Sequence, residues 1–169
     1  ALAGACAEAG AQVELISGPV HLDAPERVTV HPVRSATEMC EQALTLSAGA
    51  DVFIGAAAVA DYRPESALAE KIKKTGGAPL TLTLVENPDI IACVAQSASR
   101  PSMVVGFAAE TESLMDHARE KRQRKGLDMI IANDVSDPDT TFGSEQNAVH
   151  LITEAQEQSL PLASKRVIA

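Results

Sequence analysis

The chain alternates between segments with helical spacing of apolar residues and short, continuous apolar runs. Met39 and Ala43 lie on one side of a predicted amphipathic helix over residues 36–47. Residues 51–57 form an apolar run that is typical of a strand buried on both faces of a parallel sheet. The same criteria predict helices over 2–9, 87–97 and 112–125 and strands over 12–16, 27–30, 103–108, 129–132 and 148–152.

Strands that alternate with helices predict right-handed βαβ units. We therefore expect an α/β fold, a Rossmann-like, doubly wound, mostly parallel sheet, in a single domain over residues 1–169. Pro88 is expected in the first turn of its helix, where proline is tolerated, and Gly126 is expected to end the helix over 112–125. Residues 165–169 read as the start of a further helix.

Residues 59–80 break this pattern. They are polar, contain Pro64 and Gly77, and include a basic cluster, and such long segments are usually functional or disordered. Residues 80–84 then alternate Thr and Leu, as an exposed strand does. We expect a protruding flap over about 62–86 that packs on another chain.

The first residues predict a helix without the strand and glycine-rich turn that precede the first helix of a doubly wound fold. We therefore expect that this sequence is part of a longer domain.

The composition of the chain argues against several classes of function and binding partner. The net charge is −9 and aromatic residues make up 2% of the chain, so nucleic acid and anionic membrane surfaces are poor candidate partners. The apolar run around 52–60 is too short to cross a bilayer. Cys6, Cys40 and Cys93 form neither a disulfide framework nor a zinc spacing, so we expect a cytoplasmic protein with no metal site built from protein ligands alone.

Three strand ends carry candidate ligand residues, because ligands of open α/β sheets bind beyond the carboxyl ends of the strands. Asp61 follows a run of small residues that either approach a ligand or pack tightly against a helix. Phe107 either covers a nucleobase or fills the core, and Asn133 lies either in a ligand loop or in a simple turn.

Basic residues are concentrated in two places. Eight of the fourteen Lys and Arg residues lie at 71–74 or 119–125, which suggests a local site for a phosphorylated small molecule. Cations at a helix C-terminus also complement the helix dipole, so the second cluster has a purely structural explanation too. No P-loop motif is present, and Asn87-Pro88-Asp89 offers backbone N–H groups at a helix start.

Six motifs carry a resemblance to a known family. They lie at 55–63, 70–74, 87–90, 105–111, 121–125 and 132–135, in the family's order and across essentially the whole chain. With these motifs the chain resembles phosphopantothenoylcysteine synthetase, and the CTP-using bacterial type more than the ATP-using type.

The resemblance implies a ligase of coenzyme A biosynthesis that joins phosphopantothenate to cysteine. The carboxylate attacks the α-phosphorus of CTP to give an acyl-cytidylate, and the cysteine amine then displaces CMP. It also implies Mg²⁺ with the triphosphate, a homodimer that exchanges the flap strand, and a fused decarboxylase domain upstream.

Site residues follow from the same motifs. The resemblance implies that Lys71, in the K-x-K-K motif, stabilises charge at the α-phosphate. The residues that it implies in nucleotide binding are Gly55, Ala56, Ala57, Asp61, Asn87, Pro88, Phe107, Lys121 and Lys125, with Asn133 as a further candidate.

The sequence also departs from the family, because the N-terminal motifs that hold phosphate and serve the second half-reaction would precede Ala1. We expect the chain alone to be inactive or impaired. One alternative is a non-catalytic nucleotide-binding or dimerisation fragment. Another is an NAD(P)-dependent oxidoreductase, although Ser17-Gly18-Pro19 stands where an acid would hold the ribose.

Overall fold

The computed structural model describes residues 1–66, 70–73, 77, 79–110, 114–134 and 144–169. Its helices are α1 (Leu2–Glu8), α2 (Ala36–Ser47), α3 (Ile90–Ala95), α4 (Leu114–Lys125) and α5 (Lys165–Ile168). Its strands are β1 (Val13–Ser17), β2 (Val28–Pro32), β3 (Val52–Gly55), β4 (Tyr62–Pro64), β5 (Leu84–Glu86), β6 (Met103–Glu110), β7 (Met129–Asp134), β8 (Gln146–Thr153) and β9 (Glu157–Ser164).

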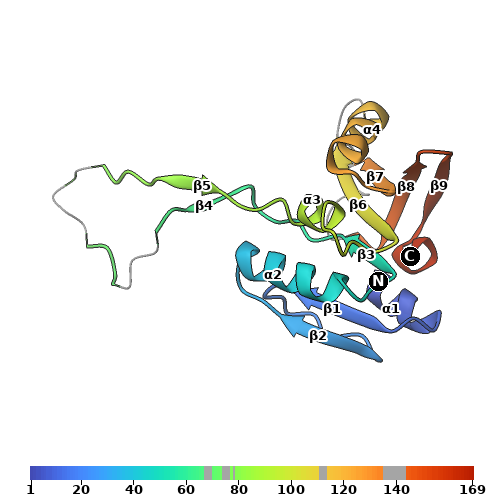
Figure 1. Cartoon of the computed structure of the whole chain (residues 1–169), viewed down its shortest axis with the longest axis horizontal. Coiled ribbons are helices and arrows are strands. Elements are labelled where there is room, and N and C mark those ends of the chain that lie inside the picture. The colour runs from blue at the N-terminus through green and yellow to red at the C-terminus, as the bar shows by residue number, and fades with distance from the viewer. Residues whose placement is uncertain (67–69, 74–76, 78, 111–113, 135–143) are drawn as a thin grey trace.

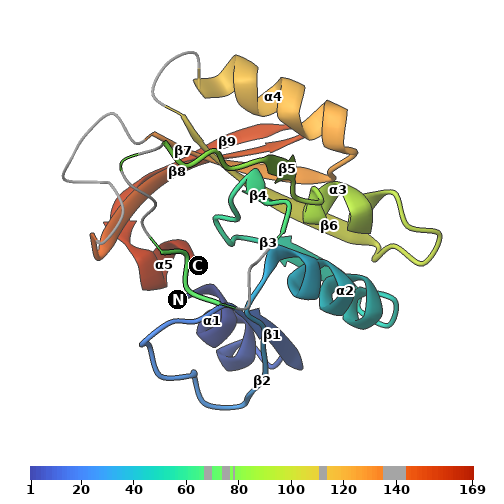
Figure 2. The same cartoon turned by 90° about the vertical axis from the view of Figure 1, so that its left-hand side faces the viewer.

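A five-stranded sheet in the order β3-β6-β7-β8-β9 forms the centre of the fold. Strands β3, β6 and β7 are parallel, and β8 and β9 add an antiparallel hairpin at one edge. β1 and β2 pair in parallel as a separate two-stranded sheet. Figure 2 shows α4 above the central sheet and α5 below it. The expected α/β fold with a mostly parallel sheet is confirmed.

The core lies between this sheet and its helices. Val104 on β6 and Ile130 on β7 are fully buried, as are Val94 on α3 and Ala118 on α4. The two strand side chains come from the continuous apolar runs of the sequence, because a parallel strand covered on both faces buries successive residues. Gly126 has a φ of 69°, and this left-handed conformation ends α4 as expected.

The flap (residues 62–86) extends away from the rest of the molecule (Figure 1). At its base, β4 pairs antiparallel with β5, and the Glu65 N–H donates to the Thr83 carbonyl oxygen over 3.0 Å. The strand expected at 80–84 was placed too early, because ladder pairing begins only at Leu84. Exposure of alternate residues, the signal used for that strand, does not depend on having a partner strand.

Two other expectations need correction. Pro88 does not lie in the first turn of α3, because Asp89 is the N-cap and its Oδ1 accepts a hydrogen bond from the Ala92 N–H at 3.3 Å. Strand β9 was not predicted at all. It is a largely exposed edge strand with a proline at position 161, so it lacks the apolar pattern of a buried strand.

None of the helices in the described part of the chain is long and apolar enough to span a membrane.

Candidate functional site

The carboxyl ends of β3 and β6 meet at a pair of glycines. Gly55 and Gly106 are register partners, and the side chain of Ile91 on α3 covers both. A Cβ at Gly55 would lie 2.8 Å from Ile91 Cδ1, and one at Gly106 would lie 2.7 Å from Leu127 Cδ1. Close packing of α3 against the sheet therefore explains both glycines, which favours the packing interpretation at Gly55.

The loop after β3 is open to solvent. Ala56 and Ala57 are exposed, and so is Asp61. The Asp61 carbonyl accepts a 2.7 Å hydrogen bond from the Asn87 N–H, whereas its carboxylate bonds to no residue in the described ranges. This carboxylate is therefore available to accept hydrogen bonds from a ligand.

Asn87 holds that loop in place. Its Nδ2 donates to the Ala60 carbonyl at 2.8 Å, and its Oδ1 accepts from Arg63 at 3.2 Å. The side-chain amide is thus engaged within the protein, so Asn87 positions Asp61, and Pro88 follows it directly.

Arg63 was not foreseen from the sequence. The guanidinium donates to the Glu86 carbonyl as well as to Asn87, and it joins the two strands at the base of the flap. Its partners lie 23 and 24 residues away along the chain, a separation at which no local pattern signals contact.

The basic residues at the C-terminal end of α4 lie in two different places. Lys125 Nζ lies 2.8 Å from Asp89 Oδ2, next to the loop that carries Asn87. Lys121, one turn earlier, lines a shallow groove on α4 together with His117 and Arg124.

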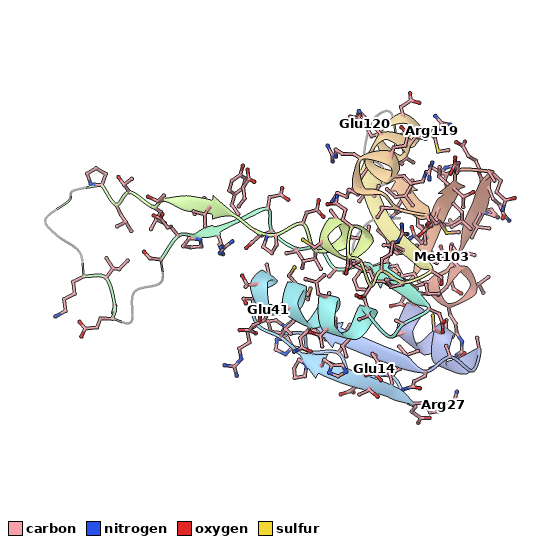
Figure 3. The ribbon with its side chains drawn as sticks, viewed as in Figure 1. Glu14, Arg27, Glu41, Met103, Arg119 and Glu120 are labelled. Atoms are coloured by element: carbon pink, nitrogen blue, oxygen red, sulfur yellow. The ribbon has the colours of Figure 1, made fainter. Side chains whose placement is uncertain are left out.

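Arg119 has a structural role, because its guanidinium is paired within the protein. Its guanidinium forms a two-point ion pair with Glu157 on β9, at 2.7 and 2.9 Å, and a further contact with Asp116. Figure 3 shows Arg119 on the side of α4 that faces β8 and β9. The basic cluster is therefore only partly available for a ligand.

Phe107 and Asn133 lie on the adjacent strands β6 and β7. Asn133 was expected in a loop or turn after its strand, but it lies within β7, opposite Ala109 of β6, because pairing with β6 and β8 extends that strand to Asp134. Phe107 is half-buried, and the part of the chain that the structure describes does not pack it against the main core cluster. The Asn133 Oδ1 is buried without a hydrogen-bond partner in the described ranges. An unsatisfied acceptor of this kind costs about 1–3 kcal/mol, and a water molecule or a ligand that supplies a donor would remove this cost.

Lys71 does not join these residues within one chain. Segment 70–73 lies at the far end of the flap in Figure 1, and Lys71 and Lys73 are exposed there. Lys74 lies outside the described residues. The structure therefore brings together Asp61, Asn87 and Lys125 but leaves Lys71 apart.

Cys40 is poorly suited to act as a nucleophile. Burial raises the pKa of the Cys40 thiol to about 11, and the neighbouring Cys93 contributes to the same shift. A thiol with such a pKa is almost wholly protonated near neutral pH, and the thiolate is the reactive form.

Comparison with known proteins assigns the fold to a family. A family model described as the DNA/pantothenate metabolism flavoprotein C-terminal domain, DFP, matches residues 1–169. The chain belongs to the DFP family.

Two relatives are similar to this chain in sequence over essentially its whole length. The coenzyme A biosynthesis bifunctional protein CoaBC of Escherichia coli (strain K12) is 48% identical over 171 residues, which cover 99% of this chain and 42% of that protein. The protein of the same name from Vibrio cholerae is 46% identical over 170 residues, covering 100% of this chain and 43% of the relative. The chain thus spans less than half the length of these curated relatives.

Solved structures agree with the DFP assignment. The crystal structure of the C-terminal domain of CoaBC has a TM-score of 0.80 at 30% identity and covers 99% of this chain and 74% of that chain. A DNA/pantothenate metabolism flavoprotein from Streptococcus pneumoniae has a TM-score of 0.75 at 20% identity, covers 97% of this chain and 80% of that chain, and supports the fold alone.

Proposed function

We propose that this chain is the synthetase part of a phosphopantothenate–cysteine ligase in coenzyme A biosynthesis. The observation that carries the proposal is the cluster of Asp61, Asn87 and Lys125 in a DFP-family fold, in which Asn87 holds the Asp61 loop and Lys125 pairs with the neighbouring Asp89. The E. coli relative is named for coenzyme A biosynthesis and for two activities. We expect a decarboxylase domain in the remainder of the full-length protein, and a cytoplasmic location.

The proposed reaction has two steps. A carboxylate oxygen of phosphopantothenate attacks the α-phosphorus of CTP, and pyrophosphate leaves. The cysteine amine then attacks the acyl carbon of the mixed anhydride, CMP leaves with the bond electrons, and the amine loses a proton. Activation is needed because a free carboxylate is a poor electrophile, so the protein's task is to position the reactants and stabilise charge.

The residues fit these steps as follows. Lys125 and Lys121 contact the phosphates from α4, and the exposed Asp61 carboxylate accepts hydrogen bonds from the nucleotide. Backbone groups of 55–57 approach the same ligand, and Phe107 lies against the base. Lys71 stabilises the transition state at the α-phosphate, because an ammonium group on a flexible stem can reach several oxygens.

Lys71 is proposed to come from a second copy of the chain. The flap exposes the large apolar side chains of Tyr62, Leu80, Leu82 and Leu84. An isolated two-stranded hairpin is marginally stable in water, which favours a flap that packs on a partner subunit. Sedimentation should give a dimer, and Leu82→Asp should shift it toward monomer.

Magnesium is proposed to arrive with CTP. The described residues contain no group of three or more side chains that could hold a metal ion. Mg²⁺ that accompanies a nucleotide is held mainly by phosphate oxygens and water, with one or two carboxylates, and Asp61 is an available carboxylate. Bound in this way, the ion would neutralise charge on the triphosphate.

The test uses the full-length protein that contains this chain. It is mixed with CTP, Mg²⁺ and phosphopantothenate without cysteine, and the acyl-cytidylate is sought by mass spectrometry. The intermediate should appear only with CTP and should disappear when cysteine is added. CTP binding without the intermediate would instead indicate a non-catalytic nucleotide-binding domain, and NADPH binding without CTP binding would indicate an oxidoreductase.

A further inference from the structure

The hydrogen-bond ladder of the flap continues past its base into the candidate nucleotide loop. Strands β4 and β5 pair with Tyr62 opposite Glu86. The next rung joins Asn87 to Asp61, because the Asn87 N–H donates to the Asp61 carbonyl at 2.7 Å. Side chains alternate between the two faces of a strand, so those of Asp61, Arg63 and Asn87 share one face of this hairpin. The loop and the flap are therefore parts of one hydrogen-bonded unit.

Arg63 joins the two strands of this unit through a single nitrogen atom. Its Nη1 donates to the Glu86 carbonyl at 2.5 Å and to Asn87 Oδ1 at 3.2 Å. In an antiparallel ladder, hydrogen-bonded pairs alternate with pairs whose carbonyl groups point away from the partner strand. Glu86 belongs to a pair of the second kind, because the adjacent rung from Asn87 to Asp61 is hydrogen-bonded. Arg63 thus supplies a donor that the ladder itself does not provide.

The same bond fixes the orientation of the Asn87 side-chain amide. The Ala60 carbonyl can only accept a hydrogen bond, and the Arg63 guanidinium can only donate one. A single orientation satisfies both groups, with Nδ2 donating to Ala60 at 2.8 Å and Oδ1 accepting from Arg63. Without the guanidinium this orientation would lose one of its two determinants, and the hold of Asn87 on Ala60 would weaken.

These bonds order the loop more than they stabilise the fold. Arg63 is exposed, and no carboxylate in the described ranges forms an ion pair with it. Hydrogen bonds that water can replace contribute little net stability. Their effect is instead to hold a long side chain, and the backbone that it contacts, in one arrangement.

We propose that Arg63 is a positioning residue for nucleotide binding in its own chain. By fixing the Asn87 amide it holds Ala60, and with it the neighbouring Asp61 carboxylate, in place before CTP arrives. A loop that is already ordered binds its ligand with a smaller loss of conformational entropy. This inference rests on the proposed function, because it takes CTP as the ligand of the loop.

Arg63→Met and Arg63→Lys test the role by calorimetry with CTP and Mg²⁺ on the full-length protein. Methionine keeps an unbranched side chain but has no N–H donor, whereas the lysine ammonium has three. Arg63→Met should raise the Kd for CTP at least about fivefold, because hydrogen bonds from a charged donor are lost. Arg63→Lys should stay close to the wild-type Kd, since one nitrogen makes both bonds in the wild type. Arg27→Met is the matched control, because Arg27 precedes β2 and Figure 3 shows it far from the flap.

Hydrogen–deuterium exchange tests the cause in the ligand-free protein. The Asn87 N–H should exchange faster in Arg63→Met than in the wild type or Arg63→Lys. The Glu65 N–H, which donates to Thr83 further along the flap, should exchange at the wild-type rate in all three proteins.

Either of two results would overturn the role of Arg63: wild-type CTP affinity in Arg63→Met, or an Asn87 N–H that exchanges at the wild-type rate in that variant. Faster exchange at Glu65 as well would also overturn it, because the whole flap would then have opened. A wild-type protein that binds CTP but forms no acyl-cytidylate would instead contradict the proposed ligase function, and both Arg63 readouts would still apply.

Discussion

Lys125 and Asp89 join the last turn of α4 to the start of α3, with Nζ 2.8 Å from Oδ2. The Lys125 side chain is only 18% exposed, so its ammonium is held in a defined place. The other carboxylate oxygen of Asp89 accepts from the Ala92 N–H at 3.3 Å. One side chain thus caps a helix and positions a cation beside the candidate nucleotide loop.

Lys125→Gln should weaken CTP binding at least about tenfold, because a charge-assisted phosphate contact is lost. It should change the free energy of unfolding by no more than about 1 kcal/mol, since a partly exposed ion pair contributes little. Asp89→Asn should keep the helix cap but lose the ion pair, so it should weaken CTP binding by a smaller factor. Calorimetry and urea unfolding measure both effects.

Arg124→Gln provides the control for charge, because Arg124 lies in the same turn of α4. It should leave CTP affinity near that of the wild type. If Lys125→Gln bound CTP as tightly as Arg124→Gln, the role assigned to Lys125 would be wrong.

Gly106→Ala should destabilise the protein by about 1–3 kcal/mol, because the added methyl group overpacks a filled site. The new Cβ would lie 2.7 Å from Leu127 Cδ1 and 2.9 Å from Ile91 Cδ1. Gly49→Ala is the comparison, since a Cβ there meets nothing within 4 Å. Urea unfolding should show Gly49→Ala close to the wild type, and equal stability of the two variants would refute the packing argument.

The sheet was predictable from sequence at β6 and β7, where burial on both faces leaves a continuous apolar run. Val104 and Ile130 belong to such runs, and both strands were placed correctly. The run over 51–57 was expected to be buried in the same way, but it forms the shorter β3 at the edge of the central sheet, and the residues of β3 are exposed or half-buried. Strand β9 was not predicted from the sequence because its outward residues are polar and it contains a proline. The cap at Asp89 moved Pro88 out of α3, since an N-cap side chain depends on local hydrogen bonding that periodicity does not reveal.

For the site, sequence could identify residue types at strand ends but not their partners. Asn87 was expected to lie near a ligand, but the sequence could not show that its amide bonds to Ala60 and Arg63. Arg119 was counted with the phosphate-binding cations, yet it pairs with Glu157 from a distant hairpin. These contacts join residues far apart in the chain, so only the folded structure reveals them.

Arg119 should also govern the titration of Glu157. The hydrogen bond from Arg119 holds the pKa of Glu157 below its ordinary value of 4.5, and His150 adds a weaker effect of the same sign. A lowered folded-state pKa means that the pair stabilises the protein above that value. The contribution is then lost as the pH falls below 4.5 and through the folded-state pKa.

An NMR titration of the Glu157 carboxyl group checks this directly. The midpoint should lie below 4.5 in the wild type and return toward 4.5 in Arg119→Gln. Arg124→Gln removes a charge from the same helix without touching Glu157 and should leave the midpoint unchanged. An identical midpoint in the wild type and Arg119→Gln would contradict the assigned cause.

Lys71→Gln should abolish formation of the acyl-cytidylate, a loss of at least about 100-fold, because the charge that stabilises the transition state is removed. CTP should still bind, since Lys125 and the 55–61 loop remain. Lys73→Gln removes the same charge two residues away on the flap and should retain most activity. Rates from quenched mixtures measure the difference, and equal rates in both variants would exclude the special role of Lys71.

Mixing two inactive variants tests whether Lys71 acts on the partner subunit. Segment 70–73, which contains Lys71, lies at the far end of the flap in Figure 1, and Asp61 is bonded to Asn87 at its base, so we propose that a site using both residues combines two chains. Lys71→Gln and Asp61→Asn homodimers should each be inactive.

In a mixed dimer, one site receives Lys71 from the Asp61→Asn chain and Asp61 from the Lys71→Gln chain. Random exchange of subunits should therefore restore about a quarter of the wild-type activity, because half of the dimers are mixed and each contains one intact site. If Lys71 served its own chain, every site would lack one of the two residues, and the mixture would stay inactive after full exchange.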